Sequence, residues 1–183
     1  MSNQNIQENI EEYALHPVIS IHRDRGAATV VAVKYIATNR HVDRAELEDF
    51  VRDRHRGVLL TTRRDGRPQS SLVTMGLSGG DLLVSSYPER AKVHNVVRNP
   101  DVSMVVMSDE FSGEWVQVDG QGRVTFLPEA VEELVEYFRC ISGEHSDWDE
   151  YREAMVRQGK CLIRVTIDDW GPVATGGFPP SLA

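Results

Sequence analysis

Hydrophobic positions along the chain change spacing several times, and each change predicts a different element. Apolar residues recur at helical spacing near the N-terminus, over 1–16, and again over 43–56 and 128–142. The second helix has the clearest start, because Asp43 and Glu46 stand three apart as in a capping box, where each side chain accepts a hydrogen bond from the other's backbone N–H. We expect this helix to end at Gly57. Two further helices are predicted over 89–98, which Asn99-Pro100 stops, and over 147–157.

The segments between these helices predict strands. Asp65-Gly66 separates apolar runs over 58–63 and 68–75, and such a pair forms a hairpin because the turn needs positive φ. Ser78-Gly-Gly-Asp81 is a second turn. Further strands are predicted over 82–86, 102–107, 115–119, 122–127 and 160–167, with one or two more over 18–36 around an Arg25-Gly26 turn. The Gly/Pro-rich tail from Gly171 is expected to be irregular.

The order of these elements indicates the fold class. Six or seven strands are interrupted by a few helices, with no regular strand–helix–strand alternation. This order predicts a mainly β chain with helices, an α+β fold built as a small antiparallel barrel. We expect an N-terminal extension over 1–43, a barrel domain over 44–170 and a tail over 171–183.

Composition narrows the classes of function. The chain has 183 residues, enough for one well-buried domain, and no apolar run approaches the length of a membrane span. A net charge of −8 argues against a nucleic-acid or anionic-membrane partner. The N-terminus lacks the features of a signal peptide, and Cys140 and Cys161 form no Cys-x-x-Cys pair. We therefore expect a cytoplasmic protein with reduced thiols and no structural zinc site.

One group of residues points to phosphate chemistry. Ser85 ends a predicted strand, and Arg90 and Lys92 open the helix that follows it. Free N–H groups at a helix start favour an anion, and neighbouring cations strengthen that preference. The alternative interpretation is that these residues form an ordinary solvent-exposed helix start without a ligand. Cations at positions two apart converge only if Arg90 lies at the entrance of the helix.

Other side chains could line a ligand groove. Gln69 and Ser71 alternate onto one face of a strand, with Thr62 and Arg63 across the hairpin. Trp115 could stack on a flat ring, although a tryptophan also serves as core or interface packing. The segment 52–67 concentrates arginines in an acidic chain, which suits either a small anionic ligand or a solvated basic face.

The sequence supplies no catalytic side chain and no metal site. The six histidines have no metal-ligand spacing, and His145 fits a polar helix start better than a catalytic role. Gly120-Gln-Gly122 lacks the third glycine and the strand-to-helix context of a dinucleotide site. No Ser/His/Asp or Cys/His triad can be assembled.

Three blocks, over 59–71, 85–100 and 137–155, resemble the pyridoxamine 5′-phosphate oxidase-like superfamily of flavin and deazaflavin oxidoreductases. They are most similar to its branch that uses coenzyme F420. The resemblance implies an FMN-binding type of split β-barrel, a homodimer with cofactor sites at the subunit interface, and a small-molecule substrate. It places Ser85, Arg90 and Lys92 at phosphate-binding positions, Gln69, Ser71 and Asn95 near the cofactor, and Trp115 where an aromatic approaches from the partner subunit.

Three functions follow from this resemblance. The first is an F420-dependent reductase that transfers a hydride from the deazaflavin to a conjugated organic acceptor, with the arginines of 63–67 helping to hold the anionic F420 tail. The second is an FMN-dependent oxidase or flavin reductase with the same fold. The third is a protein that binds and carries F420 without turnover. The N-terminal extension is longer than the compact family core, and His94 and Val96 interrupt a helix that is more basic in some relatives.

Overall fold

The computed structural model describes residues 18–24, 27–33, 36–110, 113–177 and 179. The chain divides into two compact units, residues 1–38 with 176–183 and residues 39–175. In the first unit, β1 (Val18–Asp24) pairs antiparallel with β2 (Ala27–Val33), so two strands lie where one or two were predicted. The predicted helix over 1–16 and the predicted Arg25-Gly26 turn lie outside the described residues.

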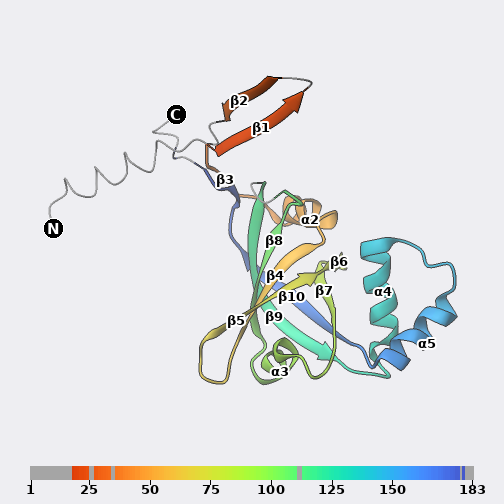
Figure 1. The fold of residues 1–183 in the computed structure, drawn as a ribbon. Coiled ribbons are helices and arrows are strands. Elements are labelled where there is room, and N and C mark those ends of the chain that lie inside the picture. The colour runs from red at the N-terminus through yellow and green to blue at the C-terminus, as the bar shows by residue number, and fades with distance from the viewer. Residues whose placement is uncertain (1–17, 25–26, 34–35, 111–112, 178, 180–183) are drawn as a thin grey trace. The chain divides into compact units, whose positions relative to one another are not determined.

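The second unit is built on one curled antiparallel sheet (Figure 1). Its strands follow the order β5-β4-β8-β9-β10-β7-β6, and short β3 and β11 pair with each other beside this path. The bounds are β3 (Thr38–Arg40), β4 (Arg56–Thr62), β5 (Pro68–Thr74), β6 (Gly76–Ser78), β7 (Asp81–Ser86), β8 (Asp101–Met107), β9 (Trp115–Thr125), β10 (Cys161–Trp170) and β11 (Val173–Thr175).

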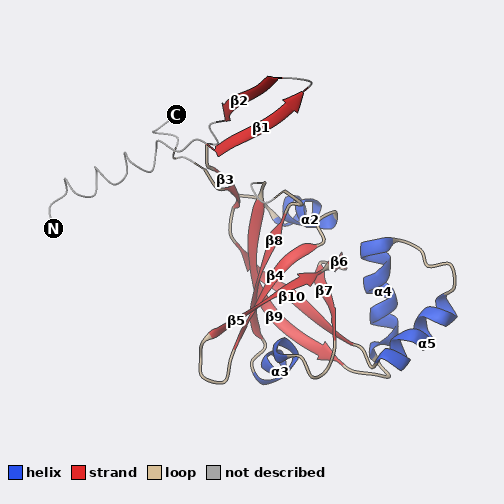
Figure 2. Ribbon diagram, viewed as in Figure 1, coloured by secondary structure: helices blue, strands red, loops and turns tan. Residues whose placement is uncertain are grey.

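In the described part of the chain, four helices accompany the sheet, and Figure 2 shows their arrangement. They are α2 (Arg44–Arg52), α3 (Ala91–Arg98), α4 (Ala130–Ser142) and α5 (Trp148–Gln158). Helix α4 lies against β6, β7 and β10, and α5 packs on α4. Strand β5 approaches β7, but the two are not hydrogen-bonded to each other, so the barrel is split along this line. The predicted α+β split antiparallel barrel is therefore confirmed.

Alternation along β7 and β10 produces two cores. Val84 and Ile163 point into the barrel, where they join Leu59, Met104 and the buried face of α2. Leu83 and Leu162 point the opposite way and pack under α4 and α5. Ser85 follows the second set by the same alternation, so the end of β7 presents it on the side where α4 and α5 lie.

Several predicted boundaries require correction. Helix α2 has the predicted Asp43 capping box. It ends at Arg52, with Asp53 as its C-cap, and Gly57, where its end was predicted, belongs to β4. The short strand β6 was not predicted, and the tail expected to be irregular contains β11. The two strands predicted over 115–119 and 122–127 form the single strand β9.

Gly120 explains why β9 is continuous. A side chain there would place its Cβ 2.0 Å from the Thr166 backbone oxygen, so the glycine permits close approach of two strands instead of forming a turn. The partner strand has a register irregularity between Ile167 and Asp169 at this point. A glycine that looks like a break in the sequence is thus a packing requirement within the strand.

Candidate functional site

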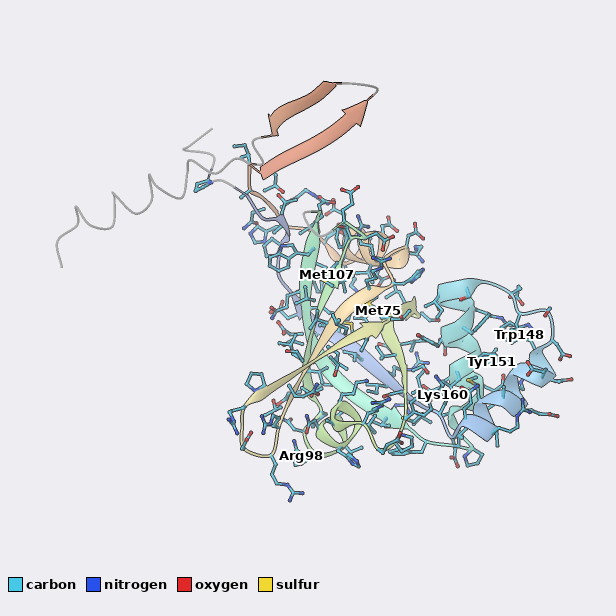
Figure 3. All side chains as sticks on the ribbon, in the orientation of Figure 1. Met75, Arg98, Met107, Trp148, Tyr151 and Lys160 are labelled. Atoms are coloured by element: carbon cyan, nitrogen blue, oxygen red, sulfur yellow. The ribbon has the colours of Figure 1, made fainter. Side chains whose placement is uncertain are left out.

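A cavity of about 390 Å³ lies where the barrel is split, between β5, the ends of β7 and β10, and helices α3, α4 and α5. We call it the seam pocket. Its lining combines hydroxyl, aromatic and aliphatic side chains with two lysines: Leu72, Val73, Thr74, Ser85, Lys92, Tyr137, Phe138, Tyr151, Met155 and Lys160. Figure 3 shows Lys160 and Tyr151 on the side of the sheet where α4 and α5 lie.

The charge of the seam pocket is positive in an acidic protein. Two of the chain's three lysines, Lys92 and Lys160, line it, and none of its lining residues is acidic. Among the described residues, no carboxylate lies within ion-pair distance of either ammonium group. Partly buried cations without a partner are unfavourable, so this arrangement suits an anion supplied from outside the chain.

The environment of the pocket lowers the pKa of Lys92. Burial lowers the pKa of its ammonium group, and the nearby guanidinium of Arg90 lowers that pKa further. Both causes penalise the charged form in the absence of a ligand. A bound anion would offset both, because it restores electrostatic stabilisation that the protein itself does not provide.

The Tyr87 ring contacts Lys160, which precedes β10, and lies near Arg90 at the start of α3. The Lys160 Nζ lies 4.6 Å from the centroid of the Tyr87 ring, and the Arg90 guanidinium carbon lies 6.0 Å from it. An aromatic face attracts a cation without neutralising its charge. Tyr87 therefore holds Lys160 and Arg90 near the end of β7 while leaving both able to bind an anion.

The start of α3 adds backbone donors to these cations. Arg90 occupies the N-cap position, and no side chain caps the helix there. The Val93 N–H donates to the Arg90 backbone oxygen at 2.9 Å, which leaves the N–H groups of Ala91 and Lys92 available to an anion. Arg90 and Lys92 could converge only if Arg90 lay at the start of the helix, and its N-cap position satisfies this requirement.

A second set of predicted residues forms a hydrogen-bonded chain across β4, β5 and α3. The Asn95 Nδ2 donates to Thr61 Oγ1 at 3.0 Å, and Thr61 Oγ1 donates to Gln69 Oε1 at 3.0 Å. Gln69 Nε2 in turn donates to Ser71 Oγ at 2.8 Å. Arg98 donates to Asn95 Oδ1 at 2.9 Å. This chain fixes the orientation of Gln69 and Ser71 from a buried anchor.

The remaining predicted residues lie elsewhere. Thr62 and its neighbour Thr61 line a separate groove that also contains Asp101, Asp119 and Asp168. Arg63 and Arg67 at the hairpin tip both pair with Asp65, at 3.1 and 2.6 Å, and Arg67 is the main cause that lowers the pKa of that carboxyl. Trp115 is 40% exposed and lines a third hollow with Trp170. Of the nine predicted site residues, only Ser85 and Lys92 line the seam pocket; the others are Thr62, Arg63, Gln69, Ser71, Arg90, Asn95 and Trp115.

Sequence reasoning missed Lys160 and Thr61. Lys160 follows Gly159, a helix C-cap with φ of +65°, so a Gly-Lys pair between a helix and a strand was the available signal. Thr61 was passed over for Thr62, although strand alternation places Thr61 on the buried face, with 3% exposure. Both omissions concern residues whose importance depends on partners distant in the sequence.

The aromatic side of the seam pocket is held by α4 and α5. The Tyr137 hydroxyl donates to the Thr74 backbone oxygen at 3.2 Å and so connects α4 to β5 across the split. Burial raises the pKa of Tyr137 to about 12, so the hydroxyl remains protonated near neutral pH. Tyr151 donates to the Leu134 backbone oxygen at 3.1 Å and packs at a tilt against Phe138. These bonds fix the wall of the pocket.

None of the helices described is long and apolar enough to cross a membrane. Across the same part of the chain, no three His, Cys, Asp or Glu side chains gather closely enough to hold a metal ion.

The family model for pyridoxamine 5′-phosphate oxidase matches residues 44–174. The chain belongs to this family. That span includes α2, the barrel strands β4–β10 and every residue of the seam pocket. Family membership therefore applies to the split barrel and its pocket.

Solved structures with the same fold have varied descriptions. A conserved hypothetical protein from Mycobacterium tuberculosis is 20% identical, with a TM-score of 0.62 over 73% of this chain and 86% of its own. An F420 reductase is 20% identical, with a TM-score of 0.52 over 68% and 94%. The heme storage protein HutZ from Vibrio cholerae is 19% identical, with a TM-score of 0.53 over 70% and 93%. At these identities the likeness establishes the fold.

The residues of the seam pocket fit a phosphate-bearing flavin or deazaflavin cofactor. Lys92, Arg90 and the uncapped start of α3 supply positive charge and backbone donors, and Ser85 supplies a hydroxyl. The pocket provides no carboxylate that would repel the phosphate. The acidic groove around Asp101 and Asp168 has the opposite character and does not suit an anion.

Proposed function

We propose that this protein is an F420-dependent reductase. The observation that carries the proposal is the pair of unneutralised lysines in the seam pocket, next to the uncapped start of α3. The fold family and an F420 reductase among the structures with this fold support it. The deazaflavin supplies hydride chemistry when bound, so the protein's task is to bind and orient cofactor and acceptor.

In this proposal each residue has a limited role. Lys92, Arg90 and Ser85 bind the phosphate, and the start of α3 donates backbone N–H groups to it. Gln69 and Ser71, held by the Thr61–Asn95 chain, present oriented amide and hydroxyl groups to the cofactor. We assign no side chain as proton donor, and water can supply the proton that follows hydride transfer to a conjugated acceptor.

The homodimer is part of the same proposal. Leu72 is 83% exposed on β5 and Trp115 is 40% exposed on β9, and both would gain from cover by a second copy. A second copy would also bring its own Trp115 toward the cofactor, as the family resemblance implies. Sedimentation of a species with about twice the chain mass of 20.6 kDa supports this part of the proposal, whereas a species at the chain mass contradicts it.

Turnover tests the catalytic claim. Reduced F420 is mixed with the protein and with conjugated enones and quinones, and oxidation of the cofactor is followed by its absorbance. We expect acceptor-dependent oxidation that the Lys92→Gln variant reduces. Tight F420 binding without oxidation by any acceptor would identify a carrier. Turnover with FMN but not F420 would identify the flavin-dependent alternative.

A further inference from the structure

Four aromatic rings gather where α4 turns into α5. Phe138 belongs to α4, His145 to the connecting residues 143–147, and Trp148 and Tyr151 to α5 (Figure 3). The ring centroids of every pair among the four lie between 4.9 and 5.9 Å apart. Each ring therefore contacts the other three at a separation that favours aromatic pairing, and we call this group the ring cluster.

The ring cluster has two layers relative to the seam pocket. Phe138 and Tyr151 line the pocket, whereas His145 and Trp148 do not. Because each of the second pair contacts both of the first, His145 and Trp148 form an outer layer that supports the rings of the pocket wall. The roles assigned in the proposed function involve neither residue of this outer layer.

The two rings of the pocket wall depend on different contacts. The Tyr151 hydroxyl donates to the Leu134 backbone oxygen at 3.1 Å, which anchors that ring independently of the outer layer. Phe138 has no polar atom, so packing alone fixes its ring. His145 and Trp148 meet it edge-on, with interplanar angles of 76° and 89°. Such T-shaped contacts depend on ring orientation, so they restrict the Phe138 side chain to one rotamer.

Polar contacts hold the outer layer itself in place. Trp148 Nε1 donates to Glu144 Oε2 at 3.0 Å, and Arg139 Nε donates to Glu144 Oε1 at 3.1 Å. The Arg139 guanidinium carbon also lies 4.6 Å from the centroid of the Trp148 ring. The His145 Nδ1 contacts the Asp147 backbone at 2.6 and 3.0 Å. The connection between α4 and α5 therefore fixes both outer rings before any ligand is bound.

We propose that His145 and Trp148 are positioning residues, which hold the Phe138 ring in the orientation that packs on a flat conjugated ring bound in the seam pocket. A ring already fixed in one orientation loses no rotamer freedom when the ligand binds, so the contact is stronger. This inference rests on the proposed function and adds the chemical group that this wall of the pocket recognises. Both the deazaflavin and a conjugated acceptor such as a quinone carry such a group.

Substitutions in the outer layer test the inference, because neither of its residues lines the pocket. For Trp148→Leu and His145→Leu, F420 affinity is measured by fluorescence titration without turnover. The KM and kcat values for a naphthoquinone and for cyclohexenone, which has no aromatic ring, are measured with reduced F420. If Phe138 packs on the cofactor, we expect the dissociation constant of F420 to rise about fivefold.

The acceptor measurements distinguish the second source of the flat ring. If Phe138 packs on the acceptor, we expect the KM for the naphthoquinone to rise about fivefold in both leucine variants. F420 affinity, kcat and the KM for cyclohexenone should then change less than about twofold. A general loosening of the structure would not separate the two acceptors in this way.

Two variants control for the loss of a ring as such. Trp148→Phe keeps a ring in the outer layer, and we expect every constant to stay within about twofold of the wild type. Phe126→Leu removes a ring that is 42% exposed and lies outside the ring cluster, and we expect the same result. Thermal melts show whether each variant is folded, and His145→Leu provides the test if Trp148→Leu is not.

The outcomes separate this inference from the proposed function. Unchanged F420 affinity together with an unchanged naphthoquinone KM in the folded leucine variants would overturn the inference. An equal rise in KM for both acceptors, with F420 affinity unchanged, would overturn it as well. A wild type that binds FMN instead of F420 would overturn the proposed function, and FMN titration of the same variants would still test the role of the outer layer.

Discussion

At the residue scale, Lys92 connects stability to ligand binding. Its pKa is lowered in the folded protein, so between the folded and unfolded pKa values the unfolded chain binds more protons. The stability of the ligand-free protein therefore rises as pH increases through that lowered pKa. At neutral pH the charged Lys92 weakens the free protein, and a bound anion removes that cost.

We predict that Lys92→Met stabilises the ligand-free protein while it weakens F420 binding. Methionine keeps an unbranched side chain but removes the desolvated charge, so we expect the melting temperature at pH 7 to rise by about 1–3 °C. Thermal melts with and without F420 measure both effects. For the wild type, F420 affinity should fall as pH rises through the lowered Lys92 pKa. A less stable Lys92→Met protein with undiminished F420 affinity would contradict the assignment.

Thr61 tests the buried hydrogen-bonded chain. Thr61→Val keeps the shape of the side chain but leaves Asn95 Nδ2 and Gln69 Oε1 without their partner. We expect a loss of about 1–3 kcal/mol in the free energy of unfolding, measured in urea. Thr62→Val is the neighbouring control, and we expect it to stay within about 0.5 kcal/mol of the wild type. Equal stability of the two variants would show that the chain does not anchor Gln69.

At the element scale, β9 and β10 depend on one close backbone approach. Gly120→Ala would drive a Cβ into the Thr166 backbone oxygen, which cannot rotate away. We expect a loss of about 3 kcal/mol or more in the free energy of unfolding. Gly122→Ala is the matched control, since its nearest neighbour is the movable Val96 side chain at 2.8 Å, and we expect a smaller loss. Similar losses for both would contradict this explanation of β9.

Elements that depend on local chemistry could be predicted from the sequence. The Asp43 capping box and the Asp65-Gly66 hairpin each depend on residues a few positions apart, and both are present. The continuity of β9 could not be predicted, because Gly120 meets Thr166 from another strand. The strand β11 was missed for the same reason, since its pairing with β9 joins Ala174 to Trp115.

At the scale of the whole molecule, the split in the barrel creates the site. The sheet ends at β5 and β6, and β5 approaches β7 without hydrogen bonds between them. Helices α4 and α5 close one side of this opening with aromatic side chains, and the end of β7 and the start of α3 bring the cations. The sequence indicated Ser85, Arg90 and Lys92 because they are close together in the chain. It could not indicate Lys160, which only the fold brings to them.

The central claim is that the seam pocket selects a phosphate-bearing deazaflavin, and direct titration tests it. Purified protein without cofactor is titrated with F420 and, separately, with FMN, following fluorescence and heat. We predict micromolar or tighter binding of F420 and weaker binding of FMN, with both reduced in Lys92→Gln. A preference for FMN would move the protein to the flavin-dependent branch of its family. Binding of neither ligand would contradict the assignment of the seam pocket as a cofactor site.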